Sequence, residues 1–138
     1  MHIRPFKETD TELVSALWQE VFPDEPAHNA PALVIKQKIT HQPELFFVSE
    51  EAGKITGTIL SGYDGHRGWF YAVTVSPQHR RQGLGTKLIR HAEQALTALG
   101  CTKINLQVRS TNAAVVAFYK ELGYEVEERI SMGKRFSQ

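Results

Sequence analysis

Hydrophobic residues recur at helical spacing in two stretches of the chain. The first follows Thr9 or Asp10, either of which can serve as a helix N-cap, and it stops at Pro23. The second ends at Gly100, a residue type that is common just after a helix C-terminus. The two stripes are Leu13, Val14, Leu17, Trp18 and Val21, and then Leu84, Leu88, Ile89, Ala92, Ala95, Leu96 and Leu99. Each stripe predicts an amphipathic helix.

Runs of β-branched, aromatic and other apolar residues predict strands between the helices. Asp64-Gly65 separates two of these runs and is a common hairpin pair. The expected strands cover Ile3–Phe6, Leu45–Val48, Ile55–Tyr63, Trp69–Val75 and Ile104–Val108, with one or two more within Tyr124–Phe136. Shorter helices are expected from Pro31 to about Thr40 and from Asn112 to Leu122. The predicted order is β-α-α-β-β-β-α-β-α-β-(β), with no repeat, linker or low-complexity segment.

Composition narrows the class of protein. The 138 residues, 41% hydrophobic and 22% charged, suit one globular domain. Lys+Arg 16 against Asp+Glu 15 gives a net charge of +1, which lacks the positive bias of a nucleic-acid binder. Cys101 is the single cysteine, and no stretch approaches the roughly 18 apolar residues of a membrane span. The N-terminal residues contain no signal-peptide apolar region, so we expect a cytoplasmic protein without membrane partners.

No metal site is expected, because the histidines lack the spacing of metal ligands. The residues considered are His2, His28, His41, His79 and His91.

The segment from Val73 to Thr86 carries the clearest chemistry. A predicted strand runs into a turn that opens directly into the second long helix. Glycines at 83 and 85 remove side chains where a ligand would approach, and free N–H groups at the helix start favour an anion. Arg80 and Arg81 add positive charge that suits phosphate. A P-loop pattern is absent, and Leu88 stands where a dinucleotide fingerprint needs a third small residue.

The pattern Arg80-x-x-Gly83-x-Gly85 after Val73-Thr74-Val75 resembles motif A of the GNAT acetyltransferase superfamily. The resemblance implies that backbone N–H groups of the turn hold the pyrophosphate of coenzyme A (CoA), while the strand pairs with the pantetheine arm. The alternative is a surface turn whose glycines permit tight packing. The CoA-binding residues implied by the family are Val73, Thr74, Val75, Arg80, Arg81, Gln82, Gly83, Leu84, Gly85, Thr86, Asn112 and Tyr119.

The segment Asn112–Tyr124 resembles motif B of the same family, Asn-x-x-Ala-x-x-Phe-Tyr-x-x-x-Gly-Phe/Tyr, with a departure at Val115, where alanine is frequent. By resemblance, Tyr119 would donate a proton to the departing CoA thiolate. The alternative is a core tyrosine. Asn112 could cap the helix, contact CoA, or do both.

The strand Trp69–Val75 contains no carboxylate or histidine that could serve as the general base. The nearest candidates are Asp64 and His66, or a water held by Tyr71. Alternatively, Asp64 only forms the hairpin turn and His66 is a solvent-exposed residue without a catalytic role. An acidic group borders the acceptor pocket expected from the fold and would suit a cationic amine, although a solvated loop explains it equally. Its residues are Glu20, Asp24 and Glu25.

Together with the run Gly62–Gly68 and the segment Ser131–Arg135, these motifs resemble the YpeA-type bacterial branch of the superfamily. The resemblance implies a single α/β domain over residues 1–138, with a mixed, mostly antiparallel sheet, helices on both faces, and a V-shaped splay between the fourth and fifth strands. It further implies an N-acetyltransferase that uses acetyl-CoA as cosubstrate and transfers the acetyl group directly to a primary amine.

In this reading, a backbone N–H near Val73 stabilises the oxyanion. The acceptor, a small molecule or a protein amine, is left open, and a homodimer is one expectation for the assembly. Two rival functions also stay open. One is an acyl-CoA sensor without turnover. The other is a nucleic-acid module that uses Arg80, Arg81, Lys87 and Arg90, against which the near-neutral charge argues.

Overall fold

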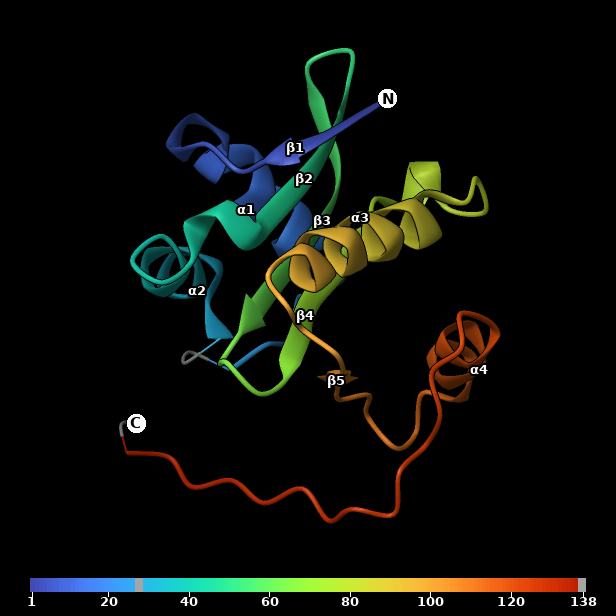
Figure 1. The fold of residues 1–138 in the computed structure, drawn as a ribbon. Helices are drawn as coiled ribbons and strands as arrows, with labels where there is room; N and C mark the ends of the chain where they lie inside the picture. Colours follow the sequence, from blue (N-terminus) through green and yellow to red (C-terminus); the bar gives the residue numbers. More distant parts are fainter. Residues whose placement is uncertain (27–28, 137–138) are drawn as a thin grey trace. The chain divides into compact units, whose positions relative to one another are not determined.

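The computed structural model describes residues 1–26 and 29–136 (Figure 1). The chain forms two compact units, residues 1–106 and residues 107–138. The first unit contains β1 (His2–Pro5), α1 (Thr11–Val21), α2 (Pro31–Lys38), β2 (Phe46–Glu51), β3 (Lys54–Tyr63), β4 (Gly68–Val75), α3 (Leu84–Ala98) and β5 (Ile104–Leu106). The second contains α4 (Ala113–Glu121).

The strands of the first unit form one five-stranded sheet in the order β1-β2-β3-β4-β5. Neighbouring strands are antiparallel from β1 to β4, and β5 is parallel to β4. This arrangement confirms the predicted mixed, mostly antiparallel sheet. β5 lies opposite only Gly68, Trp69 and Phe70, so no described strand pairs with that side of β4 from Tyr71 to Val75. The pairing between the fourth and fifth strands, where the splay was predicted, therefore ends at Phe70.

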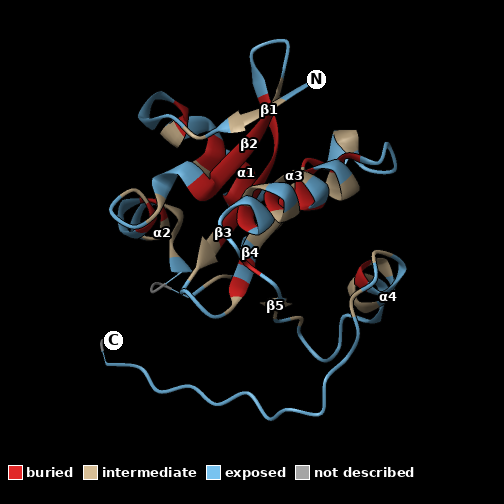
Figure 2. Ribbon diagram, in the orientation of Figure 1, coloured by how far each residue is buried: buried red, intermediate tan, exposed pale blue. Residues whose placement is uncertain are grey.

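Helices cover both faces of the sheet, as predicted. Successive side chains of a strand point to opposite faces. Phe46 stacks on Trp18 of α1 with ring centroids 6.0 Å apart, whereas Phe47 meets His91 of α3 at 4.6 Å. Figure 2 shows the buried side of α3 against the strands. Five of the seven residues of the predicted stripe are buried, whereas Ala95 is half-buried and Leu99 is exposed. The buried residues are Leu84, Leu88, Ile89, Ala92 and Leu96.

Two glycines let α3 pack closely against the sheet. A Cβ atom at Gly57 would lie 2.9 Å from Cδ1 of Leu88, and one at Gly68 would lie 2.9 Å from Cδ1 of Leu96. At Gly57 the carbonyl oxygen of Thr74 would also lie 2.8 Å from the Cβ atom, so the backbone leaves no room for a side chain, whereas at Gly68 neighbouring side chains would have to shift. These glycines thus let α3 lie close to the sheet. The helix begins after residues 76–83, which follow β4 and include the 3-10 helix Pro77–His79 (Figure 1).

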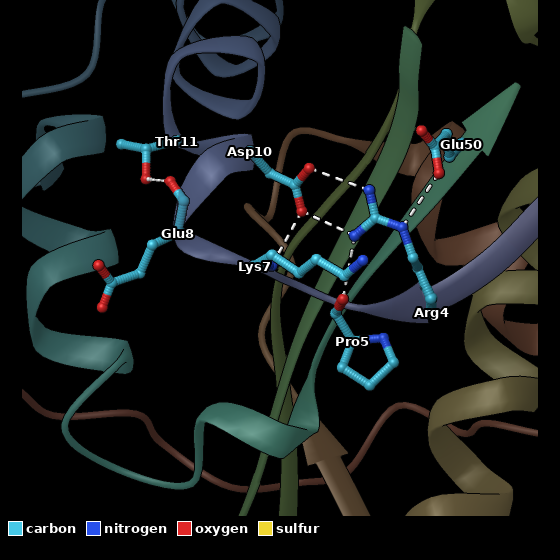
Figure 3. Close-up of polar contacts among 7 residues, drawn as sticks. All are labelled: Arg4, Pro5, Lys7, Glu8, Asp10, Thr11 and Glu50. Atoms are coloured by element: carbon cyan, nitrogen blue, oxygen red, sulfur yellow. Dashed lines mark hydrogen bonds and ion pairs between the residues drawn. The ribbon is translucent and has the colours of Figure 1, made fainter. Parts of the chain in front are cut away.

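An ion-pair group joins β1 to the start of α1 and to β2 (Figure 3). The guanidinium of Arg4 donates to both carboxylate oxygens of Asp10, at 2.8 and 2.9 Å, and its Nε donates to Glu50 at 3.1 Å. Asp10 occupies the N-cap position of α1, as predicted, but its carboxylate also accepts the Lys7 N–H and caps no amide of the helix. Arg4 lowers the pKa of Asp10.

The second unit departs from the prediction after α4. Among residues 124–136 the structure contains no strand, although one or two were expected there. The backbone hydrogen bonds of this segment are local, such as Arg129 N–H to the Glu127 carbonyl. Alternating apolar residues form a strand only when another strand accepts their hydrogen bonds, and here Val126, Ile130 and Met132 stay exposed. The predicted strand 104–108 is likewise shorter and ends at Leu106.

Candidate active site

β4 carries a bulge in the middle of its predicted ligand-binding segment. Thr58 of β3 lies opposite Thr74, but Leu60 lies opposite Tyr71, so Ala72 and Val73 together face one residue of β3. Ala72 has a φ of 49°, which is uncommon for a residue other than glycine. A bulge of this kind bends a strand and re-aims its backbone groups, and such strain concentrates at functional sites.

Three buried side chains hold the bulge from the α1 face of the sheet. The hydroxyl of Thr58 accepts from the Trp18 indole N–H at 2.9 Å and donates to the Ala72 carbonyl at 2.8 Å. It also lies 2.7 Å from the Thr74 hydroxyl. The Thr58 hydroxyl has a single hydrogen, which it donates to the Ala72 carbonyl because that carbonyl can only accept. The Thr74 hydroxyl must therefore donate to Thr58. The network fixes the direction of the Ala72 carbonyl.

The turn after β4 leads into an uncapped helix start. Arg81 and Gly83 both have left-handed φ values, 64° and 77°. Gly83 is the N-cap residue of the 15-residue α3, and it has no side chain to bind the first amides. The helix ladder begins with Lys87 N–H to the Gly83 carbonyl at 3.1 Å. The amides of residues 84–86 therefore precede the ladder, and together with the helix dipole they suit an anion.

The arginines flanking this turn lie at the surface. Arg80 and Arg81 are both exposed, and Arg80 Nε donates to the Val75 carbonyl at 3.2 Å. Gly83 is open as well, because a Cβ atom there would meet nothing within 4 Å. The turn thus has room for a phosphate group beside the free amides, with positive charge nearby. Gln82 is exposed in the same turn, whereas Leu84 is buried and anchors the helix start.

A cavity of about 210 Å³ lies beside the bulge, on the α1 and α2 side of the sheet. It is lined by Trp18, Phe22, Glu25, Asn29, Pro31, Val34, Tyr71 and Ala72. Asn29 donates to the Glu25 carboxylate at 2.9 Å. Sequence reasoning noted Glu25 and Tyr71 but could not find the cavity, since its walls come from four separate segments. Of the acidic group named from the sequence, Glu25 alone is part of this lining.

The hairpin between β3 and β4 holds the two residues considered as bases. One oxygen of the Asp64 carboxylate accepts the N–H groups of His66 and Arg67, both at 2.7 Å. These bonds lower the pKa of Asp64, which is fully exposed. Gly68 begins β4, and at about 3.3 Å per residue Ala72 lies roughly 13 Å further along the strand. The structure therefore does not bring Asp64 or His66 beside the bulge.

In the second unit, Asn112 caps α4, because its side chain accepts the Val115 N–H at 3.3 Å. Tyr119 is buried, 8% exposed, and its ring meets those of Phe118 and Tyr124 edge to face, at 5.1 and 5.6 Å. Burial raises the pKa of Tyr119 to about 12. The cap role of Asn112 is thus observed, while its contact with CoA and the proton-donor role of Tyr119 stay predictions.

Two further observations concern other classes of site. Over residues 1–26 and 29–136, no three histidine, cysteine, aspartate or glutamate side chains gather as metal ligands would. His28, one of the histidines considered, lies outside the described residues. None of the described helices has both the length and the apolar character needed to cross a membrane.

Comparison with known proteins assigns the chain to a family. Residues 11–124 match the Acetyltransferase (GNAT) family. The chain is 43% identical over 135 residues to an acetyltransferase of Yersinia enterocolitica, covering 98% of this chain and 95% of that protein. An acetyltransferase of Sodalis glossinidius is 43% identical over 136 residues, with the same shares covered.

Solved structures agree. Ard1 from Thermoplasma volcanium superposes with a TM-score of 0.81 at 25% identity, covering 91% of this chain and 83% of that one. An aminoglycoside N-acetyltransferase in complex with CoA has the same fold, with a TM-score of 0.77 at 20% identity. The match covers 99% of this chain and 95% of that one.

These matches define the protein first by class, as an acyltransferase. More narrowly, the chain belongs to the GNAT family of acetyltransferases, which confirms the resemblance read from its two motifs. They give no support to an acyl-CoA sensor without turnover.

Proposed function

We propose that this acetyltransferase uses acetyl-CoA as its cosubstrate and transfers the acetyl group directly to a primary amine. One observation carries the proposal: residues 72–86 join a bulged strand to an uncapped helix start in a single continuous segment. The side of β4 from Tyr71 to Val75 without a strand partner can pair with an extended pantetheine arm. The amides of Leu84, Gly85 and Thr86 would then receive the pyrophosphate.

The bulge supplies the second part of the reaction. The amine forms a bond to the thioester carbon as negative charge develops on the carbonyl oxygen, and the C–S bond then breaks to release the CoA thiolate. A strand bulge turns backbone N–H groups out of the regular ladder. We assign the Val73 N–H as the donor to this oxyanion, in a direction fixed by the bond from Thr58 to the adjacent Ala72 carbonyl.

Two proton transfers complete the scheme. Tyr119 is the proposed donor to the thiolate, and its raised pKa keeps the phenol protonated throughout the neutral range. Asp64 and His66 can act as base only through intervening water, because the hairpin lies roughly 13 Å along β4 from the bulge. Tyr71 is adjacent to Ala72 in the chain and is part of the cavity lining, so a water held by Tyr71 is the route we favour.

A pair of glycine substitutions tests the CoA site. Gly83→Glu places a negative side chain where the pyrophosphate would bind, and we expect CoA affinity measured by calorimetry to fall tenfold or more, on the order of 1.4 kcal/mol. Gly53→Glu is the matched control. Gly53 has a φ of 78° and, like Gly83, nothing within 4 Å of a Cβ atom, but it lies in the β2–β3 turn. Equal affinity in the two variants would refute this placement of CoA.

A further inference from the structure

We infer that the acceptor is a primary amine with one positive charge and an apolar body about the size of an aromatic ring, and that this body occupies the cavity beside the bulge. The inference rests on the proposed function, because it takes the cavity next to Ala72 as the place where the amine meets the thioester. Two sources can present this chemistry, a free monoamine or the N-terminal residue of a peptide.

The size of the cavity sets the first limit. Its volume is about 210 Å³. A protein cavity of about 150 Å³ accepts benzene, whereas pockets for drug-sized ligands occupy roughly 300–1,000 Å³. The cavity therefore suits one ring with a short carbon chain, and it would enclose only part of a molecule of several sugar rings.

The walls set the second limit. Apolar groups line most of the cavity, from Phe22, Pro31, Val34 and the Ala72 methyl to the ring of Trp18. The indole N–H of Trp18 is already bonded to Thr58, so that residue offers the ligand only its apolar face. Apart from Glu25, the polar residues of the described lining are Asn29 and Tyr71, so a second ammonium group or a row of hydroxyl groups would find few hydrogen-bond partners to replace its lost hydration. Such a wall selects against polycations and sugars.

The charge of the lining sets the third limit. Glu25 is the one charged residue of the lining among the described residues, and Asn29 orients its carboxylate through a bond of 2.9 Å. One carboxylate balances one ammonium group. This contact favours the charged form of the amine, so the proton must still leave before attack, through the water that we propose Tyr71 to hold.

The experiment measures acceptor binding and turnover separately. Calorimetry on CoA-saturated protein compares 2-phenylethylamine, spermidine and the aminoglycoside neamine, and CoA thiol release with acetyl-CoA gives kcat and KM for each. A short peptide with N-terminal phenylalanine forms a fourth arm and separates the two sources. We expect 2-phenylethylamine or the peptide to bind at least tenfold more tightly than either polycation, with kcat/KM in the same order.

Variants tie the preference to the cavity. Phe22→Ala should raise KM for the preferred amine about tenfold while CoA affinity is unchanged. Leu13→Ala is the matched control, because it truncates another exposed apolar side chain of the α1 region that does not line the cavity. Tighter binding of spermidine or neamine, or no measurable binding of either monoamine arm, would overturn the inference and leave the proposed function intact. Failure to bind CoA, with no thiol release from any amine, would instead refute the proposed function.

Discussion

Replacing Thr58 by valine removes one hydroxyl group from the centre of the network that holds the bulge, and it nearly preserves the shape of the side chain. Thr58 is fully buried, so water cannot replace the lost group. Three partners lose their bond: the Trp18 indole, the Ala72 carbonyl and the Thr74 hydroxyl. At about 1 kcal/mol for each bond, the free energy of unfolding should fall by about 3 kcal/mol. For a chain of this length that corresponds to a melting temperature lower by roughly 10 °C.

The effect on activity distinguishes a positioning role from a purely structural one. Without Thr58 the Ala72 carbonyl is no longer held, and the adjacent Val73 N–H loses its fixed direction toward the oxyanion. We expect kcat to fall by about tenfold with little change in the KM for acetyl-CoA, less than the roughly 10²-fold or greater loss seen when such a donor is removed outright. Both quantities are measured by CoA thiol release at a temperature well below the melting point of the variant.

Thr56→Val is the matched control for this prediction. Thr56 lies two residues earlier on β3 and is 1% exposed. Its hydroxyl bonds the Ser49 hydroxyl at 2.8 Å and the Ser49 carbonyl at 3.3 Å, but it does not touch the bulge. The Thr56→Val variant should lose about 2 kcal/mol of stability and keep its kcat. If Thr58→Val lost only stability and kept the kcat of the unmodified protein, the network would have no part in positioning the bulge.

Three further predictions concern other parts of the molecule. Tyr119→Phe should lower kcat by about 10²-fold with CoA affinity nearly unchanged, and full activity with a lower melting temperature would show a structural tyrosine only. Arg80→Ala and Arg81→Ala should each weaken CoA binding less than Gly83→Glu, because backbone amides provide most of the proposed phosphate site; abolished binding in calorimetry would contradict this. Arg4 lowers the folded-state pKa of Asp10, so this pair stabilises the fold above the ordinary aspartate pKa of about 4, and the contribution is lost as pH falls through the lowered value. Asp10→Asn should therefore cost about 3 kcal/mol at pH 7 in denaturant unfolding and flatten the stability profile below pH 4, whereas an unchanged profile would show that another group governs acid unfolding.

Local sequence patterns predicted those parts of the structure that depend on neighbouring residues. The stripe of α3 and the hairpin at Asp64-Gly65 follow from periodicity and turn chemistry, and the start of α3 at Leu84 follows from the glycines around it. The same reasoning failed at residues 124–136, where alternation predicts a strand but cannot supply the partner strand that it needs.

The remaining features depend on contacts between segments that are distant in sequence. Nothing about an alanine within a β-rich run indicates a φ of 49°, because the bulge at Ala72 is held by Thr58 and Trp18. Lys38 is another case: a lysine near a helix end suggests an exposed side chain, yet it is 3% exposed and its ammonium donates to the Ser61 carbonyl at 2.6 Å. Burial lowers the pKa of that ammonium. The cavity was beyond prediction for the same reason, since α1, α2 and β4 form it together.

Binding of acetyl-CoA through the backbone of residues 72–86 can be tested by titrating isotopically labelled protein with CoA and following the amide resonances by NMR. The amide resonances of Gly83, Leu84, Gly85 and Thr86 should shift together and saturate at the dissociation constant that calorimetry gives. The amide of Gly53, in a turn of the same backbone geometry, should not move. Saturation with CoA that leaves the four amides at the start of α3 unshifted would contradict the account.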